Sequence, residues 1–354
     1  MKRVLYLTNI EVPYRVRFFN ELAKECDLTV LYERKRSANR NSAWAGSEHR
    51  DFRSEYLGGI NVGDENTFSL KIFKWIFGGY DVIVAGCFNS PVQLLAMLMM
   101  RLCRIPFFIN SDGEAFLTGD GIKAKIKRFL LSGAKGYLAA GEKSAATMAL
   151  ALGTKVVPYH FSSLNEEELR INASSNVQRG NKILVVGQYF DYKGLDVALD
   201  AAKLDSTISY QFVGMGGRTE LFLQEKMPKP LENVEVVPFL QKKDLEQAYR
   251  TCAAVVLPSR QECWGLVVNE AASFGTPIVS TWGSGAAVEF LAEQYSCFLA
   301  KPGDAQDLYN KINDLRALSA NEMNDYSAFL KEKSKNYSIE SSVKAHVKAC
   351  ALGQ

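Results

Sequence analysis

The stretch SRQECWGLVVNEAASFGTPIVSTWGSG, residues 259–285, decides the fold of the second half of the chain. The apolar run just before it, residues 253–257, is typical of a buried parallel strand. A helix is expected over residues 265–274, because Gly275 suits the left-handed position that closes a helix. With a further strand at residues 277–281, the stretch predicts a strand–helix–strand unit of a parallel sheet.

Two glutamates of this stretch, Glu262 and Glu270, indicate a ligand site. Ligands of open parallel sheets bind at the carboxyl ends of the strands, where Glu262 is expected, and the helix start near Gly265 offers amides to a phosphate. A glutamate near a helix start also suits the helix dipole without any ligand. Glu270 is harder to explain in that way, because its apolar neighbours predict burial, and burying a carboxylate without partners is costly.

Composition limits the classes of protein that are possible. The 354 residues suffice for two domains, and a net charge of +3 gives no case for nucleic acid. Seven cysteines without a C-x-x-C pair predict reduced thiols in a cytoplasm, and three histidines argue against a histidine-rich metal centre. The longest apolar stretch, residues 91–100, is about half of what a bilayer span needs.

The order of expected elements predicts two α/β domains. Strands alternate with helices in both halves of the chain, which indicates parallel sheets with helices on both faces. The stretch 162–180 is rich in Ser, Asn and Glu and is interpreted as the interdomain segment. The predicted domains are therefore residues 1–165 and 166–337, with a cleft between them.

The second half offers further candidates for nucleotide binding. The loop that begins at Gly187 holds Lys193 just before a helix, where a lysine could neutralise a diphosphate or simply be solvated. The end of the third strand, at Phe239, could place backbone groups against a base. A glycine-rich turn, which lets backbone approach a nucleotide but lacks the full dinucleotide fingerprint, contains Gly214, Met215 and Gly216.

Four motifs in series carry a family resemblance: V-V-G-x(5)-K-G-L, F-V-G-x-G, V-P-F-L-x-x-x-D-L and L-P-S-x-x-E-x-x-G-L-x-x-x-E-A-x-x-x-G-x-P-I-V. In this order and spacing, over most of residues 181–300, the chain resembles glycosyltransferase family 4. The resemblance implies the GT-B fold, with two facing Rossmann-like domains and an interdomain cleft. The first half is similar only in general pattern, although residues 9–15 look like variants from bacterial surface-polysaccharide clusters.

The resemblance also implies roles for the donor-side residues. Glu262 would contact the donor sugar near the reacting carbon, and Glu270 would accept hydrogen bonds from the nucleotide ribose. Lys193 would be the counter-charge of the diphosphate. The backbone amides that hold this diphosphate would be those of Gly265, Leu266 and Val267.

Two positions depart from the family pattern. Gln188 stands where many members have an arginine, so a fixed charge on the diphosphate is missing there; either Lys193 suffices, or Arg218 or Arg260 takes its place. Trp264 stands where a phenylalanine is common, and it either narrows the sugar pocket or packs in the core.

In the first domain, Asp112 follows a strand and is a candidate for binding the donor sugar or orienting the acceptor, although a polar turn is an equal reading. Asp112 and Glu114 could suggest a metal pair, but the resemblance implies no bound metal. Candidate contacts with the acceptor are Pro13, Tyr14 and Arg15.

A basic amphipathic segment follows at residues 122–131. It could lie on an anionic membrane or form a solvated helix face. Its basic residues are Lys123, Lys125, Lys127 and Arg128.

By resemblance, the predicted function is a retaining, metal-independent transfer of a hexose or N-acetylhexosamine from a nucleotide-diphosphate sugar, UDP-sugar first of all, to a glycan acceptor. The acceptor would be linked to a polyprenyl diphosphate, in surface polysaccharide biosynthesis at the inner face of the cell membrane. A C-terminal helix, about 338–354, would return to the first domain. The alternatives are a non-catalytic sugar-nucleotide-binding protein and an NAD-dependent oxidoreductase, whose glycine fingerprint is missing from residues 8–13.

Overall fold

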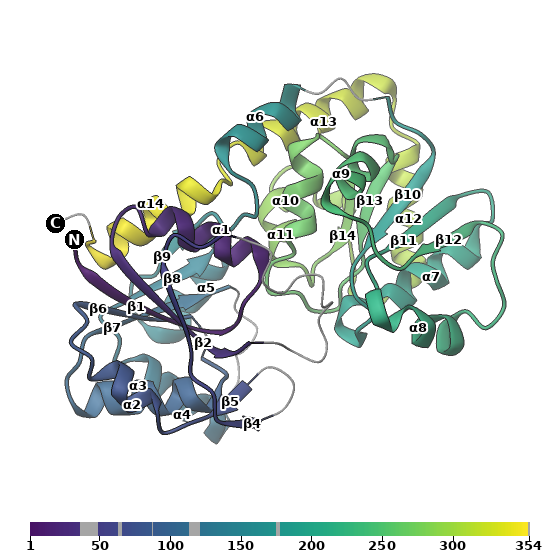
Figure 1. Cartoon of the computed structure of the whole chain (residues 1–354). Helices are drawn as coiled ribbons and strands as arrows, with labels where there is room; N and C mark the ends of the chain where they lie inside the picture. The colour runs from purple at the N-terminus through teal and green to yellow at the C-terminus, as the bar shows by residue number, and fades with distance from the viewer. Residues whose placement is uncertain (36–48, 63–65, 87, 113–120, 175–177, 353–354) are drawn as a thin grey trace. The chain divides into compact units, whose positions relative to one another are not determined.

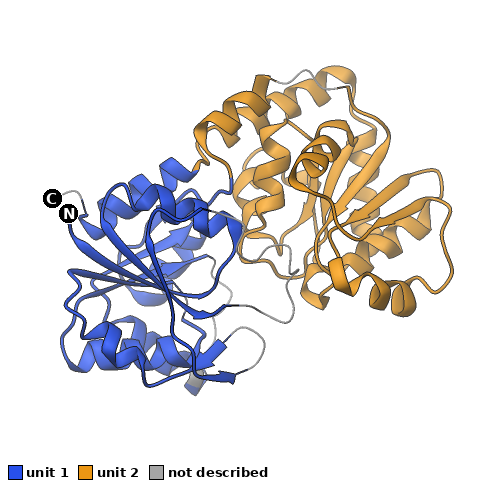
Figure 2. Ribbon diagram, in the orientation of Figure 1, with its two compact units in different colours: residues 1–163, 339–354 blue, residues 164–338 orange. Residues whose placement is uncertain are grey.

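The computed structural model divides the chain into two units, shown in blue and orange in Figure 2. Unit 1 comprises Met1–Ser163 and Ile339–Gln354, and unit 2 comprises Leu164–Ser338. The boundaries predicted from sequence, 165/166 and 337/338, lie beside these. The structure describes all residues except 36–48, 63–65, 87, 113–120, 175–177 and 353–354.

Unit 1 is a parallel sheet in the order β3-β2-β1-β6-β7-β8-β9, with helices packed on it (Figure 1). Its strands are β1 (Arg3–Ile10), β2 (Asp27–Arg34), β3 (Arg53–Tyr56), β6 (Val82–Ala85), β7 (Phe107–Ser111), β8 (Gly136–Ala140) and β9 (Val157–Tyr159), with the hairpin β4 (Ile60–Val62) and β5 (Asn66–Phe68) apart from this sheet. Its helices are α1 (Pro13–Leu22), α2 (Ile72–Ile76), α3 (Pro91–Leu102), α4 (Ile122–Leu131), α5 (Glu142–Leu152) and α14 (Ile339–Cys350). The C-terminal helix α14 thus completes unit 1, where it packs against α1, β8 and β9.

Unit 2 is a second parallel sheet, in the order β12-β11-β10-β13-β14-β15. Its strands are β10 (Lys182–Val186), β11 (Ser209–Val213), β12 (Val234–Val237), β13 (Ala254–Leu257), β14 (Ile278–Thr281) and β15 (Leu299–Ala300). Its helices are α6 (Glu166–Ser174), α7 (Leu195–Leu204), α8 (Thr219–Lys226), α9 (Lys242–Thr251), α10 (Leu266–Ser273), α11 (Gly285–Leu291), α12 (Ala305–Arg316) and α13 (Ala320–Ser334). Two parallel sheets covered by helices confirm the α/β prediction.

The unit predicted from residues 253–281 is present as β13, α10 and β14. Every residue of β13 and β14 is buried, as expected of strands covered on both faces. Gly265 enters α10 with φ +103° and Gly275 follows it with φ +65°, conformations in which a side chain is strained. The two glycines therefore set the start and end of the helix, as predicted.

The prediction of an interdomain segment at residues 162–180 was partly wrong, because α6 lies there. The amide of Glu168 donates to the Asn165 side chain at 2.8 Å and the Glu168 carboxylate accepts from the Asn165 amide at 2.9 Å, a reciprocal cap of the helix start. Leu169 is buried, and Asn172 donates to Ser273 Oγ at 3.0 Å, which holds α6 on α10. Local capping and a few packed residues outweigh the polar composition of this stretch.

Gly194 allows the start of α7 to lie against the end of β13. Its φ is +65°, and a Cβ atom there would lie 2.1 Å from the Pro258 carbonyl oxygen. We expect Gly194→Ala to lower the free energy of unfolding by more than about 2 kcal/mol through backbone strain and this clash. Gly217→Ala is the matched control, because open space surrounds Gly217. Urea unfolding of both variants measures the difference, and equal stability would contradict the described contact.

Candidate active site

Two loops of unit 2 meet at the carboxyl ends of neighbouring strands. One follows β10 and carries Lys193, and the other follows β13 and carries Glu262. The Lys193 ammonium forms an ion pair with the Glu262 carboxylate. The Tyr192 carbonyl accepts a hydrogen bond from the Arg260 amide at 2.8 Å, so the backbones of the loops are also joined. The structure thus brings together two residues that the sequence analysis singled out separately.

The backbone of Glu262 is fixed from the other side by the loop after β14. Its amide donates to the Gly283 carbonyl at 2.8 Å, and its carbonyl accepts from the Gly285 amide at 3.1 Å. The Glu262 side chain is only 14% exposed, and Ser259 Oγ lies 3.4 Å from its carboxylate. This carboxylate is therefore held in one place before any ligand arrives.

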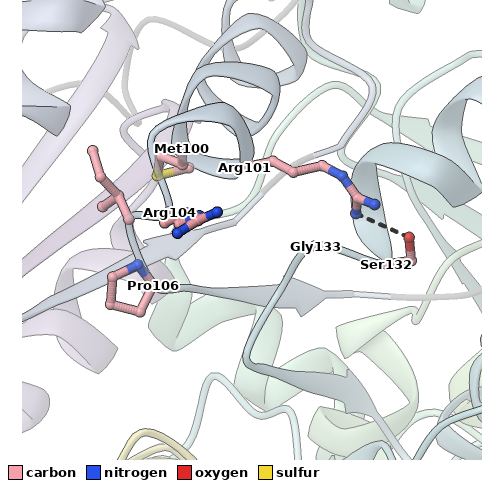
Figure 3. Close-up of a pocket in the computed structure, with 7 residues that line it drawn as sticks. Met100, Arg101, Arg104, Pro106, Ser132 and Gly133 are labelled. Atoms are coloured by element: carbon pink, nitrogen blue, oxygen red, sulfur yellow. Dashed lines mark hydrogen bonds between the residues drawn. The ribbon is translucent and has the colours of Figure 1, made fainter.

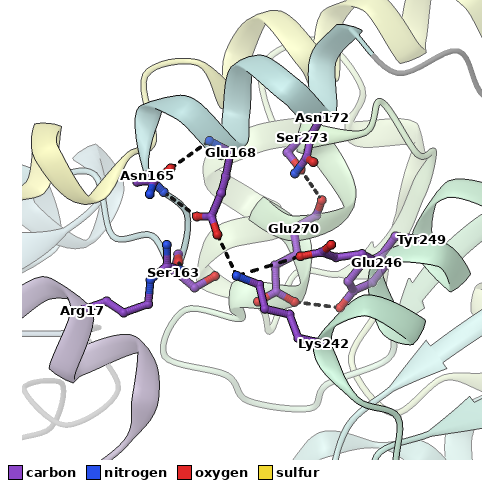
Figure 4. A network of polar contacts seen from close by, with 10 residues as sticks. All are labelled: Arg17, Ser163, Asn165, Glu168, Asn172, Lys242, Glu246, Tyr249, Glu270 and Ser273. Atoms are coloured by element: carbon purple, nitrogen blue, oxygen red, sulfur yellow. Dashed lines mark hydrogen bonds and ion pairs between the residues drawn. The ribbon is translucent and has the colours of Figure 1, made fainter. Parts of the chain in front are cut away.

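Glu270 has the partner that its apolar surroundings require. The Tyr249 hydroxyl donates a hydrogen bond of 2.8 Å to its carboxylate (Figure 4). Tyr249 is buried, and burial together with the Glu270 charge raises its pKa well above the ordinary value, so the phenol stays protonated as a donor. Tyr249 was missed from sequence, because no local pattern links it to Glu270.

The turn between Glu262 and Glu270 supplies backbone donors. Among the residues that the structure describes, none accepts a hydrogen bond from the amides of Gly265, Leu266 or Val267 at the start of α10. The first amides of a helix lack partners within it and attract anions. In the sequence, Glu262 and Glu270 flank this group of donors, which is suited to a phosphate; their roles toward a ligand stay a prediction.

The glycine-rich turn after β11 contains one predicted residue with a side chain, Met215. The Met215 side chain is fully buried, so its contribution is limited to main-chain atoms. Gly214 has φ +91°, and the Gly216 amide donates to the Pro238 carbonyl at 2.7 Å. Phe239, just beyond β12, is half-buried, and Gly187 donates its amide to the Val213 carbonyl at 2.9 Å.

Both arginines considered as substitutes for the one missing at Gln188 have other partners. Arg260 forms two hydrogen bonds, of 2.8 and 2.7 Å, with the Asp196 carboxylate. Arg218 lies over the Phe190 ring at 4.2 Å and donates to the Tyr189 carbonyl. Of the three cations considered, Lys193 therefore remains the best candidate for the counter-charge of a diphosphate. In this structure Glu262 balances its charge.

Trp264 is a core residue. It is buried, donates its indole N–H to Asn269 Oδ1 at 2.8 Å and stacks on Tyr337. Of the two readings left open by the sequence, packing is therefore the one that the structure favours.

Unit 1 holds a second polar cluster at the end of β7. Asp112 forms an ion pair with Arg15 of α1, and the Tyr159 hydroxyl donates to its other oxygen at 2.8 Å. Arg15 is buried and lies over the Phe161 ring, which also contacts Tyr14. Asp112 and Arg15 were predicted independently from sequence, and the structure joins them; Pro13 is the first residue of the same helix. Glu114 lies outside the described residues.

His346 of α14 belongs to this cluster and was missed from sequence. Its Nε2 lies 3.2 Å from Asn110 Oδ1 and its Nδ1 lies 2.7 Å from the Ser342 carbonyl. The side chain is buried, and its ring packs edge-on against Tyr159. His346 shares the buried face of the C-terminal helix with Ile339 and Val343. This helical spacing, together with the predicted return of the helix to unit 1, could have predicted that His346 is buried there.

The basic residues predicted at 122–131 lie on α4, with Lys125 exposed and Lys127 and Arg128 half-buried. Lys123 lies on the same helix, but its side chain is outside the description. No helix within the described part of the chain is long and apolar enough to cross a membrane. No group of three or more metal-ligating side chains occurs among the described residues.

Residues 166–334 match the family model for glycosyl transferases group 1, and the match covers most of unit 2. O-antigen chain mannosyltransferase C of Escherichia coli is 29% identical over 167 residues, which are 46% of this chain and 44% of that protein. The chain therefore aligns with less than half the length of this curated relative.

Solved structures resemble the whole chain. HepE of Anabaena in complex with UDP-glucose has a TM-score of 0.71 at 16% identity, covering 98% of this chain and 100% of that one. A trehalose-6-phosphate synthase, analysed for glycosyl transfer with retention, has a TM-score of 0.68 at 11% identity, with 99% of each chain covered. At such identities the likeness establishes the fold, and it confirms the predicted GT-B class.

Burial lowers the pKa of His346 from its ordinary value of 6.5 to about 4. Between these values the unfolded chain binds a proton that the folded chain does not, so stability falls as pH decreases through this window. We expect His346 to remove about 2 kcal/mol of unfolding free energy between about pH 7 and pH 5. Urea unfolding at both pH values should show a smaller loss for His346→Gln than for the unmodified chain. The same loss in both proteins would show that His346 is not buried as described.

Proposed function

We propose that this protein is a retaining glycosyltransferase of family 4 that uses a nucleotide-diphosphate sugar as donor. The observation that carries the proposal is the arrangement of Glu262, Lys193 and Glu270 around the start of α10, inside a glycosyl transferases group 1 domain. UDP-sugars are the first donors to test, because the similar HepE structure holds UDP-glucose. The transferred group is a hexose or an N-acetylhexosamine.

The site suits the charge changes of glycosyl transfer. The bond between the anomeric carbon and the diphosphate oxygen breaks, and the diphosphate gains negative charge in the transition state. The amides at the start of α10 and the Lys193 ammonium stabilise this charge, and donors fixed in advance do so most strongly. These groups take the place of a metal ion, so the reaction needs none. Glu270 accepts hydrogen bonds from the ribose hydroxyls.

Retention follows a front-face route in this proposal. The acceptor hydroxyl oxygen bonds to the anomeric carbon on the face that the diphosphate leaves, and its proton passes to a departing phosphate oxygen. When the diphosphate draws Lys193 away, Glu262 is released to contact the sugar near the reacting carbon. Support comes from the trehalose-6-phosphate synthase of similar fold, whose transfer proceeds with retention.

On the acceptor side, the proposal assigns contacts to unit 1. Asp112 orients the acceptor or the donor sugar, with Arg15 and Tyr159 fixing its carboxylate, and Pro13 and Tyr14 adjoin the acceptor. The acceptor is a glycan linked to a polyprenyl diphosphate, used in surface polysaccharide biosynthesis at the inner face of the cell membrane. The partial likeness to an O-antigen mannosyltransferase favours such a glycan.

Glu262→Gln should lower kcat by about 10²- to 10³-fold, because its contact with the sugar strengthens only in the transition state. It should not weaken nucleotide binding, because Lys193 then has no carboxylate to leave when it meets the diphosphate. Steady-state kinetics with a UDP-sugar, together with calorimetric titration of UDP, measures both quantities. Glu293→Gln is the matched control, since Glu293 is exposed in the same unit. Unchanged turnover in Glu262→Gln would remove this residue from the mechanism.

Glu270→Gln should raise the Kd for UDP about tenfold, because a charged hydrogen-bond acceptor for the ribose is lost. The titration is run on this variant and on a Glu293→Gln control. An unchanged Kd would be inconsistent with the ribose role.

The anomeric configuration of the product, assigned by NMR, tests retention. The proposal expects the linkage to keep the donor's configuration, and an inverted linkage would rule out the front-face route. Binding of UDP-sugars without any turnover across a panel of glycan acceptors would favour the non-catalytic alternative.

A further inference from the structure

An apolar ridge is exposed on α4. Ile122, Ile126 and Phe129 follow one another at helical spacing, and they are 75%, 53% and 55% exposed. The helix is anchored instead by Leu130 and Leu131, which are buried. Leu102, at the end of the neighbouring helix α3, is also exposed. Large apolar side chains grouped on one surface indicate an interaction site, whereas single ones do not.

The two helices that carry this ridge, α3 and α4, have basic side chains and no acidic ones. Residues 82–111 and 121–141, which include α3 and α4, contain seven basic residues and no acidic residue. Lys125 lies on the ridge face of α4, and Lys127 is held by the Asn89 side chain. Because the whole chain has a net charge of only +3, this part of unit 1 is unusually positive.

A cavity with two arginines adjoins the ridge. It has a volume of about 480 Å³ and is lined by Met100, Arg101, Arg104, Ile105, Pro106, Ser132 and Gly133 (Figure 3). The Arg101 guanidinium lies 4.2 Å from the Phe129 ring centroid and donates to the Phe129 carbonyl at 3.0 Å, which connects the cavity to α4. Arg104 is exposed, and its guanidinium has no hydrogen bond or ion pair with any residue that the structure describes.

We propose that α4 and the end of α3 form a membrane-docking surface for an anionic bilayer. Ile122, Ile126 and Phe129 enter the boundary between headgroups and acyl chains, with α4 lying in the membrane plane. Lys125 and Arg128 face the negative surface potential, and the cavity at Arg101 and Arg104 accepts a lipid phosphate.

An anionic bilayer is the occupant that matches all three features. A ridge of only three or four apolar side chains is small for a stable protein interface, whereas interfacial helices combine such a ridge with flanking lysines and arginines. The basic side chains of α3 and α4 match an anionic lipid surface and oppose pairing with a second copy of the same face. The surface lies within unit 1 and does not depend on the proposed transferase activity.

Co-sedimentation of the full chain with lipid vesicles tests the proposal. We expect binding to vesicles of phosphatidylcholine mixed with phosphatidylglycerol, weakened by added salt, and little binding to phosphatidylcholine alone. The double substitution Ile126→Ser with Phe129→Ser should lower the partition coefficient by more than about tenfold. Arg104→Gln should lower it about fivefold, as expected for one basic residue at an anionic surface.

Matched controls are chosen in unit 2. Leu204→Ser removes an exposed leucine and Lys243→Gln an exposed lysine, and neither should change binding. Thermal unfolding should be nearly unchanged in all variants, because every substituted side chain is exposed.

Three results would overturn the proposal. The first is no binding of the full chain to anionic vesicles, and the second is equal binding by the ridge and control variants. The third is a dimer in sedimentation velocity that the ridge substitutions abolish, because the ridge would then contact a second copy of the chain. UDP binding, measured on the same samples, should be unchanged in the ridge variant, which separates this proposal from the proposed function.

Discussion

The ion pair between Lys193 and Glu262 is the interaction on which the candidate site of unit 2 depends. It joins the loops after two neighbouring strands, next to Gly194, where a side chain would collide with the Pro258 carbonyl. The pair is mostly shielded from water, so each charge needs the other in the absence of ligand. A diphosphate brings a stronger partner for the lysine, and its arrival would leave the glutamate available to the sugar. In the proposed mechanism, binding of the donor diphosphate to Lys193 therefore also makes the Glu262 carboxylate available to the donor sugar.

Unit 1 has a comparable arrangement around Asp112, which contacts both Arg15 and Tyr159. A buried arginine is tolerable only with such a partner, because an unpaired buried charge is costly. The C-terminal helix extends the cluster through His346, which contacts Asn110 on the strand that ends just before Asp112. The last helix of the chain therefore helps to fix an acidic side chain that precedes it by more than two hundred residues in the sequence.

The sequence predicted what is local. The strand, glycine and helix around Glu262 and Glu270 lie within one short segment, so their spacing alone places Glu262 just before the helix and Glu270 inside it. The partners could not be predicted, because Tyr249 reaches Glu270 from another helix and His346 reaches Asn110 across 236 positions. Helix α6 was not predicted, because the stretch 162–180 is rich in polar residues. The start of this helix is capped by Asn165.

The most direct test of this account is a crystal structure of the chain with a bound UDP-sugar analogue. The account predicts that the Lys193 ammonium leaves Glu262 and contacts a diphosphate oxygen, that the amides at the start of α10 hold the same diphosphate, and that Glu270 accepts from the ribose. A nucleotide bound elsewhere in the chain, with the ion pair between Lys193 and Glu262 intact, would contradict it.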